Sequence, residues 1–83
     1  MADSSLVSRI RDLINRSPNV KDYSEVEGHL LSVNPKTVIT FRVDFYTKQD
    51  AEAFANSVRP LVLDSEVVVG RTGSGLFQVQ FDP

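Results

Sequence analysis

Cysteine is absent from this 83-residue chain, and histidine occurs once, as His29. Without cysteine there is no disulfide, no thiolate nucleophile and no cysteine-based zinc site. A single histidine also leaves no H-x-x-x-H or E-x-x-H spacing, the kind that holds a catalytic metal. We therefore expect no metal and no cofactor, and we interpret His29 as a strand residue that faces solvent or an interface.

Long apolar runs are missing as well. Runs such as residues 61–63 and 67–69 are far shorter than the roughly 20 apolar residues that span a bilayer. Residues 1–5 are acidic and polar and lack the basic and apolar regions of a signal peptide. These absences predict a cytoplasmic protein with no membrane contact, and the lack of cysteine fits a reducing compartment.

The chain has no excess of basic residues. Nine lysines and arginines stand against eleven aspartates and glutamates, which gives a net charge of -2. Proteins that bind nucleic acid usually carry a basic excess, because neutralising phosphates supplies most of their affinity. The charge balance therefore counts against nucleic acid as the partner. The length predicts one domain, residues 1–83.

Two segments have the spacing of amphipathic helices. Residues 4–16 follow capping side chains at Asp3 and Ser4 and end before Pro18, and their apolar positions share one helical face: Leu6, Val7, Ile10, Leu13 and Ile14. The second helix follows a capping-box sequence at residues 47–50, and Pro60 is expected to end it. Its apolar positions are Ala51, Phe54, Ala55 and Val58.

Four segments are predicted to be strands. Residues 37–46 alternate most clearly, with Ile39, Phe41, Val43 and Phe45 on one side and Thr40, Arg42 and Asp44 on the other. Residues 25–33 form the strand before it, and a turn signal at residues 34–36 separates the two. Residues 66–71 and 76–81 form the second pair, in which Phe77, Val79 and Phe81 alternate with Gln78 and Gln80.

The elements follow the order αββαββ, and the two halves echo each other. Residues 41–45 (FRVDF) match residues 77–81 (FQVQF), and residues 24–26 (SEV) match residues 65–67. A helix joins the second and third strands, so these should run parallel, and the fourth strand fits antiparallel between them. The predicted spatial order is 3-4-2-1, with both helices on one face of the four-stranded sheet. An alternative packs the two αββ units edge to edge in another order.

This arrangement is an α+β two-layer sandwich of circularly permuted ferredoxin-like order. Moving the last strand to the front of the chain yields βαββαβ, which is the ferredoxin-like order. The central strands carry the aromatic positions that a two-layer core needs.

The glycine-rich segment at residues 70–75 (GRTGSG) raises the question of phosphate binding. A phosphate-binding glycine loop follows a strand and opens a helix, so that backbone amides and the helix dipole point at the anion. Here strand alternation resumes directly after Gly75, and no Lys-Ser/Thr pair follows. We therefore interpret the segment as a hairpin loop whose glycines supply positive φ angles, with Arg71 available to an anionic partner.

The side of the sheet away from the helices is expected to be polar. RNA-recognition modules stack bases on exposed aromatic side chains of an open sheet. In this chain Phe41, Phe45, Phe77 and Phe81 share the core-facing parity, which argues against base stacking. A solvated face with a polar network across strands is the plainer interpretation. Apolar residues on both faces of the edge strands, at residues 30–31 and 67–69, favour a protein partner or a homodimer.

The sequence contains no pairing of nucleophile and base, so we expect no enzyme. The leading hypothesis is a non-catalytic protein–protein interaction module, such as a small adaptor, inhibitor or assembly component, acting through the open sheet face or an edge strand. Its candidate interface residues are Leu31, Arg42, Asp44, Val68, Arg71, Gln78 and Gln80. The alternative is a nucleic-acid-associated protein that contacts phosphates, or an acidic partner, through Arg9, Arg11 and Arg16 of the first helix, with Arg71.

Overall fold

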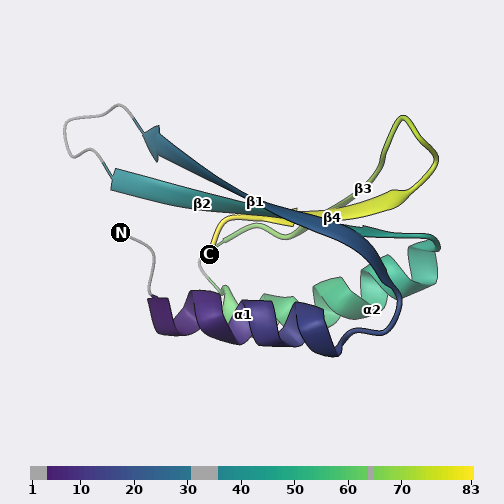
Figure 1. The fold of residues 1–83 in the computed structure, drawn as a ribbon, viewed down its shortest axis with the longest axis horizontal. Coiled ribbons are helices and arrows are strands. Elements are labelled where there is room, and N and C mark those ends of the chain that lie inside the picture. Colours follow the sequence, from purple (N-terminus) through teal and green to yellow (C-terminus); the bar gives the residue numbers. More distant parts are fainter. Residues whose placement is uncertain (1–3, 31–35, 64) are drawn as a thin grey trace.

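The computed structural model describes residues 4–30, 36–63 and 65–83, in the element order that the sequence predicts. The elements are α1 (Ser4–Arg16), β1 (Val20–Leu30), β2 (Lys36–Phe45), α2 (Lys48–Val58), a short 3-10 helix η1 (Arg59–Leu61), β3 (Val68–Arg71) and β4 (Phe77–Phe81). The prediction of an α+β chain with two α-helices and a four-stranded sheet is confirmed. Both α-helices lie on the same side of the sheet (Figure 1).

The two α-helices begin and end where local chemistry favours it. Ser17 stabilises the end of α1, because its hydroxyl donates to the carbonyl of Leu13 at 2.8 Å. Thr47 caps α2: its Oγ1 accepts from the backbone amide of Asp50 at 3.2 Å and donates to the Asp50 carboxylate at 2.8 Å. As expected, α2 ends before Pro60, and the chain continues directly into the 3-10 helix η1, which contains this proline. No described helix has the length and apolar character needed to cross a bilayer.

The sheet has the strand order β1-β2-β4-β3, and each neighbouring pair is antiparallel. Consequently β2 and β4 are the central strands, and β1 and β3 are the edges. Across the centre, Phe41 pairs with Phe81 and Val43 with Val79. Since β2 and β3 are both antiparallel to β4, they run parallel to each other, joined through α2.

Two described strand boundaries differ by more than one residue from the sequence-based prediction. Strand β1 begins at Val20, well before residue 25. The prediction misses this start because a bulge between Val20 and Asp22 breaks the alternation of side chains there. Its expected continuation at residues 31–33 lies outside the described residues. Strand β3 begins at Val68 rather than at residue 66.

The core forms between the α-helices and the inner side of β2 and β4. Its buried side chains are Val7, Ile10, Ile14, Phe41, Val43, Phe45, Ala51, Phe54, Ala55, Val58, Val62, Val79 and Phe81. Phe41 stacks on Phe81 with ring centroids 5.3 Å apart and planes 7° apart. Phe54 of α2 completes the cluster, with its ring centroid 5.4 Å from that of Phe45 and 6.4 Å from that of Phe81. The expectation that the strand aromatics face the core is confirmed, although Phe77 is only partly buried.

One of the two internal sequence matches is reflected in the structure, and the other is not. Val43 and Val79 are equivalent in the FRVDF/FQVQF match, and they pair directly, so a pseudo-two-fold axis passes between them. The shorter SEV match does not hold, because residues 24–26 lie inside β1 whereas residues 65–67 precede β3. The same axis relates Tyr23 to Val69, because Tyr23 pairs with Val43 and Val69 pairs with Val79.

Replacing Phe41 with alanine should destabilise the fold by about 3–5 kcal/mol, because it empties the centre of the aromatic cluster. Urea unfolding followed by circular dichroism measures the change. Leu63→Ala is the matched control: its side chain is 84% exposed, and its loss should cost less than about 0.5 kcal/mol. Equal costs for the two variants would contradict this description of the core.

Candidate functional site

The sheet has a bare side, formed by the residues that alternate with the core residues of β2 and β4. Directly paired residues of antiparallel strands share a face, so the register defines this side row by row. One row is Ser24, Arg42, Gln80 and Val68, and the next row is Asp22, Asp44, Gln78 and Gly70. We call these two rows the open face. Among the described residues, neither α-helix covers it (Figure 1).

The polar groups of the open face are only partly satisfied. The Gln78 side-chain amide donates to Asp44 Oδ1 at 3.0 Å. The side chain of Arg42 is exposed and has no hydrogen bond or ion pair with any of residues 4–30, 36–63 or 65–83. Asp22 lies directly opposite Asp44, an arrangement of like charges that costs stability. The face therefore offers one guanidinium without a partner beside two carboxylates.

An exposed apolar side chain and a hollow lie next to each other on β3. Val68 is 49% exposed, whereas its neighbours Val67 and Val69 pack against the core. Gly70 has open space where a Cβ would be. Around it lies a hollow of about 260 Å³, lined by Val68, Gly70, Arg71, Thr72, Gln78 and Gln80. The glycine therefore leaves room for an atom group of a partner.

The structure brings five of the seven candidate interface residues together: Arg42, Asp44, Val68, Gln78 and Gln80. Arg71 is different, because it pairs with Phe77 and so lies on the helix side of the hairpin, with its guanidinium carbon 5.7 Å from the Phe77 ring centroid. It still lines the hollow from the edge. Leu31 lies outside the described residues.

The three arginines of α1 do not act as one patch. Arg11 Nε donates to Glu25 Oε1 of β1 at 2.7 Å. This hydrogen bond and the charge of Glu25 raise the pKa of Arg11, so the guanidinium stays charged and engaged. Arg9 and Arg16 lie two turns apart and line another groove, of about 340 Å³, with Asp12, Leu13, Ser57 and Leu61. Within the described part of the chain, neither has an ion pair.

The glycine-rich segment forms the β3–β4 hairpin loop. The Thr72 amide donates to the Leu76 carbonyl at 2.8 Å, and the Gly75 amide donates to the Thr72 carbonyl at 3.1 Å. The Leu76 amide donates to Thr72 Oγ1 at 3.1 Å. These amides are used within the turn, so they do not point at an anion. The expectation of positive φ holds at Gly75 alone (φ 83°); Gly70 is part of β3, and Gly73 has no positive φ.

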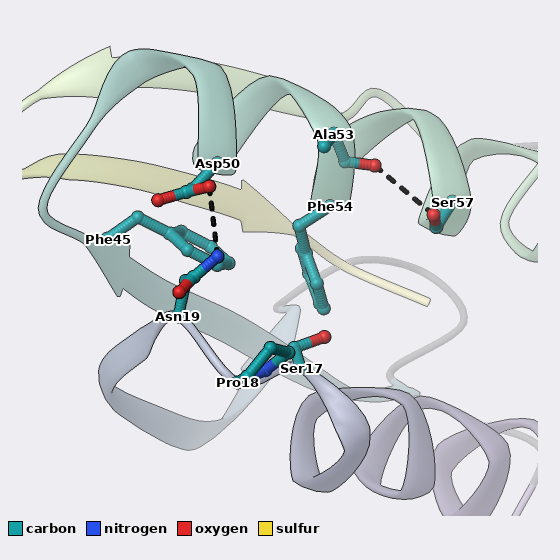
Figure 2. A pocket seen from close by; sticks show the side chains of 8 residues that line it. All are labelled: Ser17, Pro18, Asn19, Phe45, Asp50, Ala53, Phe54 and Ser57. Atoms are coloured by element: carbon teal, nitrogen blue, oxygen red, sulfur yellow. Dashed lines mark hydrogen bonds between the residues drawn. The ribbon is translucent and has the colours of Figure 1, made fainter.

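A small pocket that the sequence did not indicate lies where α1 ends and α2 begins (Figure 2). Phe45 and Phe54 line it together with Ser17, Pro18, Asn19, Asp50, Ala53 and Ser57. Asn19 donates its side-chain amide to Asp50 Oδ1 at 3.0 Å, and the Ser57 hydroxyl donates to the carbonyl of Ala53 at 3.1 Å. Because its polar groups form hydrogen bonds within the protein, we interpret the pocket as a packing contact between the two α-helices. No local pattern reveals a contact across 31 residues of sequence.

Metal-ligating side chains are not grouped in the part of the chain that the structure describes. It contains no group of three or more histidine, cysteine, aspartate or glutamate residues that could hold a metal ion. His29 lies in β1, opposite Thr37. No protein-family model, curated protein or solved structure matches the chain. The candidate site is therefore the open face, on the strength of its own chemistry.

Gly75→Ala should destabilise the protein by about 1–2 kcal/mol, because an L-residue in the left-handed region places Cβ against the backbone. Gly73→Ala is the matched control in the same loop, with equal space around the added Cβ and no positive φ. It should change stability by less than about 0.5 kcal/mol. Urea unfolding of the two variants measures the difference, and equal effects would contradict the conformational role of Gly75.

Proposed function

We propose that this chain is a non-catalytic protein–protein interaction module whose binding surface is the open face. The observation that carries the proposal is that the half-exposed Val68 and the unpartnered side chain of Arg42 lie in one row, on either side of Gln80, on a sheet covered on its other side. Arginine is enriched in protein interfaces, and burial of the exposed apolar surface of Val68 would favour binding.

The face is a better candidate than either edge strand. Edge strands recruit another chain when they are long, flat and apolar, and proteins block this with charges, bulges or shortness. Strand β1 has eleven residues, but it carries Lys21, Asp22, Glu25 and Glu27 and a bulge near its start. Strand β3 has only four residues. Both edges are thus protected against the addition of a strand, which leaves the open face as the better candidate.

We also propose that the fold is a circularly permuted ferredoxin-like sandwich. The strand order β1-β2-β4-β3 and the crossover through α2 support this relation. A cytoplasmic location is part of the same proposal, and it is supported by the absence of cysteine.

Val68→Glu tests the proposal, because a carboxylate at the centre of an apolar contact should abolish partner binding while leaving the core intact. The tagged chain is used to capture proteins from a lysate of its native host, and the captured proteins are identified by mass spectrometry. Leu63→Glu is the control, since Leu63 is more exposed and lies outside the open face. We expect Val68→Glu to lose the proteins that the wild type and the control retain. Retention of every captured protein by Val68→Glu would contradict the proposal.

A nucleic-acid partner is the second candidate, and the observation that favours it is the pair of unpaired guanidiniums in the Arg9–Arg16 groove. Against it stand the net charge of -2, the engagement of Arg11 with Glu25 and the inward-facing strand phenylalanines. The interaction module therefore remains the preferred proposal.

Fluorescence anisotropy with mixed DNA and RNA oligonucleotides at low salt separates the two candidates. If the open face binds protein, labelled oligonucleotides should show no change in anisotropy. Salt-sensitive binding that Arg9→Glu/Arg16→Glu abolishes, and that Lys48→Glu on α2 leaves intact, would establish the nucleic-acid function instead.

A further inference from the structure

We infer that the occupant of the open face is a second copy of this chain, packed face to face. The inference rests on the proposed function, because it names the partner of the same surface. Its basis is that the two rows of the open face are complementary to each other. A surface that pairs with itself about a two-fold axis needs this property, since each contact must occur twice.

The register shows how the rows would meet. Consider a two-fold axis that lies in the interface and runs across the strands, midway between the two rows. This axis places each row of one copy over the other row of the second copy. Each residue then faces its neighbour two positions along the same strand. The resulting pairs are Arg42 with Asp44, Gln80 with Gln78, Ser24 with Asp22, and Val68 with Gly70, each between copies and each formed twice.

The first pair supplies charge complementarity. Arg42 has no partner within the described residues, and Asp44 accepts one hydrogen bond from Gln78, which leaves carboxylate lone pairs free. Sheets packed face to face lie about 10 Å apart, a distance that a guanidinium and a carboxylate projecting from opposite sheets can bridge together. Because β2 is a central strand, this pair is least displaced by the angle of about 30° between packed sheets.

The last pair supplies shape complementarity. Val68 projects from the open face, and the hollow over Gly70 lies two residues further along β3. Because the axis exchanges these positions, the valine of each copy enters the hollow of the other. This contact explains a glycine inside a strand, where its backbone freedom otherwise weakens the sheet.

The amide pair completes the centre of the contact. Gln78 and Gln80 both carry donors and an acceptor, so either can pair with the other whichever copy supplies it. An unrelated partner would have to match all these rows by a separate surface, whereas a second copy matches them automatically. Since β3 and β4 have only four and five residues, the contact is small, and we expect a weak, concentration-dependent dimer.

Charge reversal provides a test that only self-association can pass. Arg42→Asp alone and Asp44→Arg alone each place like charges opposite each other, so each should weaken the dimer by at least about tenfold in sedimentation velocity. An equimolar mixture of the two variants should form a heterodimer, because the acidic face of one matches the basic face of the other. The double variant Arg42→Asp/Asp44→Arg should likewise recover the homodimer.

Gly70→Val provides a second test that does not depend on charge. An added Cβ meets no atom within 4 Å in the single chain, and a β-branched residue suits a strand, so the monomer should stay folded by circular dichroism. It fills the hollow, however, so the dimer should weaken by at least about tenfold. Arg9→Glu, on α1 away from the open face, is the control that should dimerise like the wild type.

Three results would overturn the inference: a wild-type chain that stays monomeric up to about 1 mM, single charge variants that dimerise unchanged, or a mixture that fails to associate. Its failure is distinguishable from failure of the proposed function. If the wild type is monomeric but Val68→Glu still loses captured proteins, the open face binds a different protein. If neither self-association nor capture depends on the open face, the proposed function fails as well.

Discussion

The pairing of β2 with β4 is the interaction on which the rest of the structure depends. It joins Phe41 to Phe81 and Val43 to Val79, four residues that are fully or almost fully buried. Because side chains alternate along a strand, the same register that turns these residues inward turns Arg42, Asp44, Gln78 and Gln80 outward. A slip of one residue would exchange the two sets. The core and the candidate site are therefore products of one pairing.

The small size of the chain accounts for the bare side of the sheet. A domain of this length buries only roughly 60–65% of the surface exposed when it is unfolded. Both α-helices are used to cover the side that carries the phenylalanines (Figure 1). The other side is consequently left largely to polar residues, and Val26 and Val68, each about half exposed, are apolar exceptions on it.

The sequence predicts the elements of this fold well where local chemistry decides them. The bounds of α1 agree with residues 4–16 because Pro18 follows a segment with a clear apolar face. The start of β1 was missed because a bulge interrupts its alternation. Two further features depend on tertiary geometry that no local sequence pattern contains. They are the positive φ at Gly75 and the contact of Arg11 with Glu25. The open-face residues could be predicted from the alternation of side chains along the strands. The position of Arg71 could not, because the register of the hairpin places it opposite Phe77.

The internal symmetry of the chain bears on why the open face is complementary to itself. The pseudo-two-fold axis passes between Val43 and Val79, and it relates Arg42 to Gln78 and Asp44 to Gln80. The axis of the inferred dimer runs at the level of Val43, since this residue lies between Arg42 and Asp44. The two axes therefore meet at right angles at one point. A face organised about such a centre has its rows equally spaced on either side of it, so a second copy can lie over the first without a change in register. The charge complementarity is not a product of this symmetry, because the axis relates Arg42 to Gln78 and Asp44 to Gln80; it comes from the spacing of two residues between Arg42 and Asp44 along β2.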